Sequence, residues 1–102
     1  MSDWTTAEAM VAEALRITHE DRNAANGEPE DNFAYIALMW TALLRARGVL
    51  ATPDEITAAD VARMMTAMKM ARDAHSPHRD NRTDAVGYTI CLERVEPTGL
   101  QK

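Results

Sequence analysis

The sequence predicts an all-α fold, a compact four-helix arrangement within a single domain. Apolar residues recur at helical spacing in four segments, whereas no segment shows the alternation typical of a strand. Pro and Gly residues fall between these segments. Hydrophobic residues make up 46% of the 102 residues but aromatic residues only 5%, so the core is built largely from Ala, Leu and Met. We therefore expect one domain over residues 1–102, with its core at about 6–96.

The first helix is predicted over residues 6–19. Thr5 is followed three residues later by Glu8, which is the pattern of a capping box with Thr5 as the N-cap. Residues 20–29 contain no apolar side chain larger than Ala or Pro, and they are expected to form a polar connecting loop.

The second helix is predicted over residues 30–47. Pro29 suits its first turn, where the missing N–H is harmless, and Gly48 suits the C′ position that follows its end. The apolar stripe of this helix is broad and comprises Phe33, Ile36, Ala37, Trp40, Leu43 and Leu44.

The third and fourth helices are predicted at about 58–75 and 81–96. Thr57 has N-cap character, with Asp60 in the first turn, and Pro77 must break the chain between the two helices. The third helix is expected to bury Val61, Met64, Met65 and Met68. The fourth is expected to bury Ala85, Tyr88, Cys91, Leu92 and Val95.

Charge and cysteine content exclude several classes of function. There are 11 Lys and Arg residues against 16 Asp and Glu residues, a formal charge of −5, which disfavours binding to a nucleic acid polymer. The single cysteine, Cys91, excludes an intrachain disulfide and a cysteine-based zinc cluster. No apolar run approaches the ~20 residues that span a bilayer, and no signal peptide is apparent. We expect a cytoplasmic protein without a membrane partner.

Asp84 is the best single candidate for a functional residue. It lies on the helical face that otherwise forms the core, and a buried carboxylate requires a metal, a cation or hydrogen bonds. Lys69 and Arg72 lie at the edge of the third helix's core stripe. They either extend their charges into solvent or face Asp80 and Asp84 across the turn at Ser76-Pro77.

Asp80 and Asp84 are one helical turn apart, so both can point to the same side. Two carboxylates at this spacing can bind Mg²⁺, which keeps several waters for a phosphate-bearing substrate. Asp80 is equally well interpreted as the N-cap of the fourth helix. Asn81 is either a second N-cap candidate or a hydrogen-bonding arm to a substrate.

A second polar cluster opens the helix at 30–47. Its acidic residues are ordinarily partners of the helix dipole, and this interpretation applies to Glu28, Glu30 and Asp31. Asn32 differs, because it shares a face with Phe33 and Ile36. The three histidines lack metal-ligand spacing, so zinc is not expected, and a hydrogen-bonding or phosphate-contacting role is favoured for His78.

These polar motifs resemble those of a family of small bacteriophage proteins, over roughly residues 8–96. The motifs that carry the resemblance are Glu20-Asp21-Arg22, Gly27-x-Pro29-Glu30-Asp31-Asn32-Phe33 with Trp40 on the same helix, Lys69-x-x-Arg72, and His78-x-Asp80-Asn81-x-x-Asp84-x-x-Gly87-Tyr88. The phage family is in turn distantly similar to the all-α MazG-like nucleoside triphosphate pyrophosphohydrolases. The usual MazG-like pattern, Glu-x-x-Glu on one helix and Glu-x-x-Asp on a later one, is not reproduced in order.

The resemblance implies a helical oligomer that uses Mg²⁺ to release pyrophosphate from a nucleotide, in the cytoplasm of a host cell. In that hypothesis Asp80, Asp84 and Glu30 hold the metal. Phosphates and other substrate groups contact Lys69, Arg72, His78, Arg79, Asn81 and Asn32.

Two other hypotheses fit the same residues. The protein can be a non-catalytic nucleotide binder that sequesters a nucleotide through Lys69 and Arg72 without an ordered metal. It can also be an interaction protein in which Asp84 is simply bridged to Lys69 or Arg72. Self-association is expected under all three hypotheses, because the chain is small and rich in Ala and Met and has exposed apolar stripes.

Overall fold

The computed structural model describes residues 4–22 and 28–99. Within these residues the chain forms four α-helices, one π-helical turn and no strand, which confirms the all-α fold. The elements in chain order are α1 (Thr5–Arg16), η1 (Ile17–Arg22), α3 (Pro29–Ala46), α4 (Ala58–His75) and α5 (Arg79–Val95). None of the described helices is both long and apolar enough to cross a membrane.

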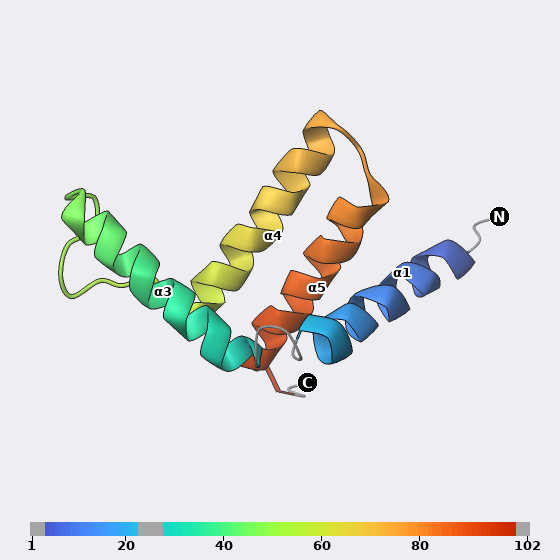
Figure 1. The fold of residues 1–102 in the computed structure, drawn as a ribbon, viewed down its shortest axis with the longest axis horizontal. Helices are drawn as coiled ribbons and strands as arrows, with labels where there is room; N and C mark the ends of the chain where they lie inside the picture. Colours follow the sequence, from blue (N-terminus) through green and yellow to red (C-terminus); the bar gives the residue numbers. More distant parts are fainter. Residues whose placement is uncertain (1–3, 23–27, 100–102) are drawn as a thin grey trace.

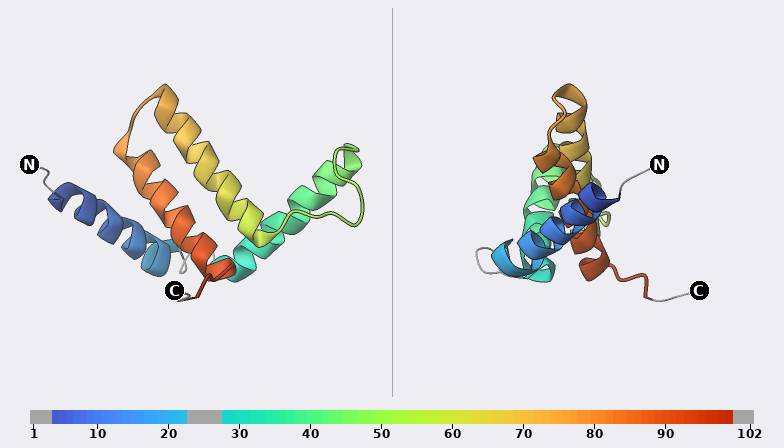
Figure 2. Two further views of the ribbon diagram at one scale, coloured as in Figure 1. Left: turned by 180° about the vertical axis from the view of Figure 1, so that it is seen from behind. Right: turned by 90° about the vertical axis from the view of Figure 1, so that its right-hand side faces the viewer.

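The helices α4 and α5 form an antiparallel pair at the centre of the fold (Figure 1). The helix α1 packs along α5, and its N-terminal end diverges from that helix. The helix α3 crosses the α4–α5 pair at the end away from the turn that joins these two helices. It extends beyond the pair, as the view from behind also shows (Figure 2). The core lies where α3, α4 and α5 meet and is centred on Phe33, Ala37, Val61, Ala62 and Cys91.

The ends of α3 follow the expectations from the sequence. Pro29 occupies its first turn, and Gly48 lies just beyond its C-cap with a φ of 76°. The N–H of Gly48 donates to the carbonyl of Arg45 at 3.0 Å, and the N–H of Val49 donates to that of Leu44 at 3.0 Å. These two bonds form a Schellman motif, which requires the left-handed conformation that Gly adopts readily.

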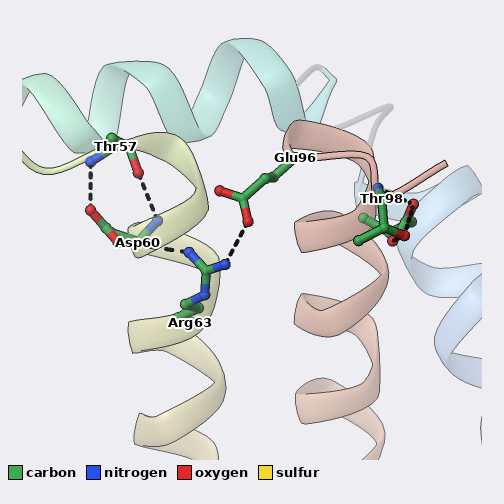
Figure 3. A network of polar contacts seen from close by, with 6 residues as sticks. Thr57, Asp60, Arg63, Glu96 and Thr98 are labelled. Atoms are coloured by element: carbon green, nitrogen blue, oxygen red, sulfur yellow. Dashed lines mark hydrogen bonds and ion pairs between the residues drawn. The ribbon is translucent and has the colours of Figure 1, made fainter. Parts of the chain in front are cut away.

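The start of α4 carries a complete capping box (Figure 3). The N–H of Asp60 donates to the Thr57 hydroxyl at 3.1 Å, and the N–H of Thr57 donates to the Asp60 carboxylate at 3.0 Å. Arg63, one turn further on, pairs with both Asp60 at 3.8 Å and Glu96 at 2.5 Å. This network ties the beginning of α4 to the end of α5.

The first helix differs from its prediction at both ends. The N-cap is Trp4 rather than Thr5, and no side chain caps the helix. Regular α-helix ends at Arg16 and continues as η1, whose wider turns change the face on which later residues lie. Thr18 is thereby buried against α5, where a Cβ at Gly87 would lie 3.0 Å from its hydroxyl oxygen. Residues 23–27 of the expected loop lie outside the described residues.

The turn between α4 and α5 is held by Asp73, which is buried. Its carboxylate accepts the backbone N–H of His78 at 3.0 Å and the Nε–H of Arg82 at 3.1 Å. The His78 N–H, followed by Arg82, lowers the pKa of Asp73 from its ordinary value against the opposing effect of burial. His78 is itself the N-cap of α5, since its Nδ1 accepts the N–H of Asp80 at 3.2 Å. The helix therefore begins at Arg79, and the interpretation of Asp80 as the N-cap is wrong.

Candidate functional site

Asp84 and Lys69 form an ion pair between α5 and α4. The Lys69 Nζ lies 2.9 Å from the Asp84 Oδ2, and the two side chains are only 16% and 18% exposed. Asp84 therefore points inward as predicted, and of the two alternatives left open for Lys69 the structure shows the one in which it faces Asp84. Because the pair is largely shielded from water, each charge depends on the other for compensation.

Asp84 also lines a polar cleft between α1, η1 and α5. This cleft has a volume of about 620 Å³ and is lined by Ala9, Glu13, Ile17, Arg79, Asp80, Thr83 and Asp84. Three carboxylates and one guanidinium thus border the same space. The volume falls within the ~300–1,000 Å³ typical of small-molecule sites.

Glu13 is a site residue that the motif analysis missed. It lies four residues before Ile17 and three after Met10, so helical spacing places the three residues on one face of α1 but does not indicate that α5 lies beside that face. Its carboxylate accepts a hydrogen bond from Arg16 at 2.8 Å. That bond is the main reason why the pKa of Glu13 is lowered, and the positive charge of Arg79 lowers it further. Arg79 is therefore close enough to act on the Glu13 carboxylate across the cleft.

A second cavity adjoins the polar cleft and shares Arg79 with it. This apolar pocket has a volume of about 550 Å³ and lies between the N-terminal half of α1 and the start of α5. It is lined by Trp4, Thr6, Ala7, Met10, Pro77, His78, Arg79 and Arg82. The exposed indole of Trp4 offers a flat apolar surface next to two guanidinium groups. Such a surface is suited to stacking against a planar ring.

Besides Asp84, three of the predicted site residues line these two cavities. Asp80 lines the polar cleft with its side chain 85% exposed, and Arg79 lines both cavities. His78 lines the apolar pocket while it caps α5. The segment from His78 to Asp84 therefore forms the wall contributed by α5.

The structure does not bring the remaining candidates to the cleft. Arg72 is exposed on α4, so of the two alternatives left open for it the one with its charge in solvent holds. The Glu30 carboxylate pairs with Arg94 at 2.9 Å. Arg94 lies ten residues after Asp84 and hence about 15 Å further along α5. The predicted grouping of Glu30 with Asp80 and Asp84 is therefore wrong.

Neither of the two asparagine candidates lines the polar cleft or the apolar pocket. Asn32 is half-buried on α3, a helix that contributes no described residue to either cavity. Asn81 is half-buried in the first turn of α5. It is not the N-cap, because His78 takes that position. Its role as an arm to a substrate stays a prediction.

The carboxylates of the polar cleft fit Mg²⁺ in one restricted way. Within the described part of the chain no three His, Cys, Asp or Glu side chains lie close enough to hold a metal ion by themselves. Mg²⁺, however, is commonly held by one or two carboxylates together with water and substrate phosphates. The oxygen ligands of Asp80, Asp84 and Glu13 are of the type it prefers, and the open cleft leaves room for a phosphate chain.

Comparison with known proteins places the chain in a family. The model of a domain of unknown function, DUF6378, matches residues 9–96. The chain belongs to the DUF6378 family. A similar protein is the Gene 55 protein of Mycobacterium phage D29, which is 39% identical over 90 residues. This alignment covers 87% of the chain but 54% of the phage protein, so the chain spans about half the length of that relative.

The DUF6378 match covers the cleft and both of its walls. It begins at Ala9 of α1 and ends at Glu96, just after α5, and therefore includes Glu13, Arg79 and Asp84. The predicted resemblance to a bacteriophage protein family is confirmed at this level. No solved structure matches the chain.

Proposed function

We propose that this DUF6378 protein is a Mg²⁺-dependent nucleotide hydrolase of the MazG-like type, which binds a nucleoside triphosphate or a related nucleotide between α1 and α5. The observation that carries the proposal is the pair of adjoining cavities joined at Arg79. One is bordered by carboxylates, and the other is apolar with an exposed indole. A nucleotide has the matching division into a phosphate chain and an apolar, planar base.

The charges of the polar cleft predict that the phosphates enter together with a divalent cation. Arg16 already pairs with Glu13 and Lys69 with Asp84, so among the residues that line the cleft Arg79 is left to meet both Asp80 and a triphosphate. Bound Mg²⁺ would supply the missing positive charge, polarise the phosphoryl oxygens and activate a water. Arg79 would then neutralise a phosphate at the junction of the two cavities, where the base enters the apolar pocket beside Trp4.

The proposed reaction is hydrolysis of the bond between the α- and β-phosphates. Water adds to the α-phosphorus, the bond to the bridging oxygen breaks, and pyrophosphate and a nucleoside monophosphate are released. The chain's contribution is mostly positioning and charge compensation, as is general in phosphoryl transfer. The Lys69–Asp84 ion pair supports this by fixing the direction of one Asp84 oxygen at the cleft.

A panel of ribonucleoside and deoxyribonucleoside triphosphates with Mg²⁺ tests the proposal, with pyrophosphate release as the readout. We expect Arg79→Ala to abolish most of the turnover. The matched control is Arg72→Ala, which removes an exposed cation outside both cavities. Absence of pyrophosphate release, together with absence of Mg²⁺-dependent binding in calorimetry, would overturn the proposal.

A second candidate is an interaction protein with a structural polar cluster. It is favoured by one observation, since the Lys69–Asp84 pair satisfies both charges within the fold. Binding of a nucleotide without turnover would instead indicate a sequestering protein. The structure gives less support to sequestration through Lys69 and Arg72, because Lys69 is engaged by Asp84 and Arg72 lies on the surface.

A further inference from the structure

The middle of α3 is apolar around its whole circumference. From Asn32 to Leu44 the sequence contains no Asp, Glu, Lys, Arg or His. A helix that is hydrophobic all round is normally buried on all sides. One face of α3 buries Phe33 and Ala37 in the core, whereas the large side chains of the opposite face are exposed.

This outer face exposes large side chains in a continuous row. Tyr35, Leu38, Met39 and Leu43 are 68%, 67%, 70% and 57% exposed, and they recur at the spacing of one helical face. The view from behind shows α3 projecting away from α4 and α5 (left panel of Figure 2). A row of this kind on a soluble domain marks an interaction surface.

The chain as a whole exposes more surface than a compact domain of its size. A folded monomer of 11.3 kDa exposes about 5,700 Å², whereas this chain exposes 7250 Å². The radius of gyration is 15.5 Å against about 13 Å for a typical domain of this length. The excess of about 1,500 Å² per chain shows that the chain has surface to spare for an interface of the size found in homodimers.

The charges at the two ends of α3 favour a second copy in antiparallel orientation. Asp31 lies in the first turn and Arg45 in the last turn, and both are exposed. They are fourteen residues apart and so lie within about 40° of each other around the helix. In an antiparallel pair with its two-fold axis near Leu38 and Met39, Asp31 of each chain therefore faces Arg45 of the other at both ends.

We propose that the protein forms a two-fold symmetric dimer by antiparallel packing of α3 against α3 of a second copy. The apolar row supplies the centre of the interface, and the Asp31 and Arg45 side chains form its two charged ends. Arg45 remains able to pair, because its Nη2–H···O bond to the Asp54 carbonyl, at 2.8 Å, uses one N–H of the guanidinium. The α1–α5 cavities are built from other helices, so the dimer leaves them open.

Sedimentation equilibrium of the full chain tests the dimer and its surface together. We expect the wild type to be dimeric. Leu38→Glu should raise the dissociation constant of the dimer about a hundredfold, because it would bury two carboxylates near the two-fold axis. The matched control is Met70→Glu, at an exposed Met on α4 that lines a different apolar groove, and it should leave the dimer intact. A monomeric wild type, or a dimer broken by Met70→Glu but not by Leu38→Glu, overturns the proposal.

Two further variants test the orientation. Asp31→Arg should weaken the dimer, and the double variant Asp31→Arg/Arg45→Asp should restore it, because only the antiparallel arrangement brings these two positions together. In the same arrangement Leu38→Cys should be cross-linked between chains by a short thiol reagent, whereas Met70→Cys should not. Failure of the double variant to recover any affinity, or equal cross-linking at both positions, contradicts antiparallel packing.

Discussion

Replacing Lys69 with methionine would leave the Asp84 carboxylate largely buried without its cation. Removing one partner of a fully buried pair typically costs about 3–5 kcal/mol. Here roughly a sixth of each side chain remains exposed, and water can solvate part of the Asp84 charge. We therefore expect Lys69→Met to lower the free energy of unfolding by about 2–3 kcal/mol, which corresponds to a decrease in Tm of roughly 10–20 °C for a domain of this size.

The double variant Lys69→Met/Asp84→Leu should recover most of this loss, because it removes both charges together. Urea denaturation of the wild type, the two single variants and the double variant gives the coupling energy, expected at about 2 kcal/mol. The control is Arg63→Met, which breaks the exposed pair with Glu96 and should cost less than about 1 kcal/mol. A Lys69→Met variant as stable as Arg63→Met, or a coupling energy near zero, would show that the Lys69–Asp84 ion pair contributes no more to stability than an exposed pair.

Three further predictions concern the elements around the site. The pKa of Asp73 is lowered in the folded state, so its contribution to stability is complete above the unfolded pKa and is lost as the pH falls through the folded pKa. The wild type should therefore lose Tm more steeply than Asp73→Asn as the pH falls below about 4, and parallel curves in circular dichroism melts would contradict this. Gly87→Ala should destabilise the protein by crowding the Thr18 hydroxyl, but it should stabilise a Thr18→Ala background by up to about 1 kcal/mol through helix propensity. Destabilisation of equal size in both backgrounds would refute that contact. Thr57→Ala should cost about 1 kcal/mol in urea denaturation through loss of the capping box, and an unchanged midpoint would show that the cap is dispensable.

The helices were predictable because each is marked by local chemistry. Helix α4 has its predicted bounds, since Thr57 with Asp60 defines its start and Pro77 prevents its continuation past the turn. The end of α3 was predictable from Gly48, whose φ is one that few other residues adopt. The end of α1 was not, because a π-helical turn leaves no simple mark on the sequence and shifts the face of every residue after it.

The site was predictable only in part, because it depends on how helices cross. Asp84 and Lys69 could be paired from their positions on two core stripes joined by a short turn. Helical spacing indicates the face on which a side chain lies but not whether its charged end reaches a partner or stays in solvent. Arg72, one turn closer to the end of α4 than Lys69, lies on the surface. Glu13 was missed because its role depends on α1 lying beside α5, and no local pattern indicates which helices are neighbours.

Asp73 was missed for a different reason. Its carboxylate binds a backbone N–H and a guanidinium that are five and nine residues away, so neither the motif spacing nor the helical face distinguishes it. A polar residue that organises a turn resembles a solvent-exposed residue in the sequence. The burial of Asp73 became visible only when the turn itself was known.

The packing of α1 has a consequence for the energetics of local opening. Among the elements that the structure describes, α1 contacts α5 and η1 alone, whereas α5 is also held by α4 and α3. Separating α1 from α5 would therefore disrupt one interface and leave the Lys69–Asp84 pair and the core in place. Backbone amides of α1 are then expected to exchange with solvent through a local opening well below the free energy of global unfolding. Such an opening would move the α1 wall of the cleft while α4 and α5 stay packed, so the cleft could widen without unfolding of the whole domain.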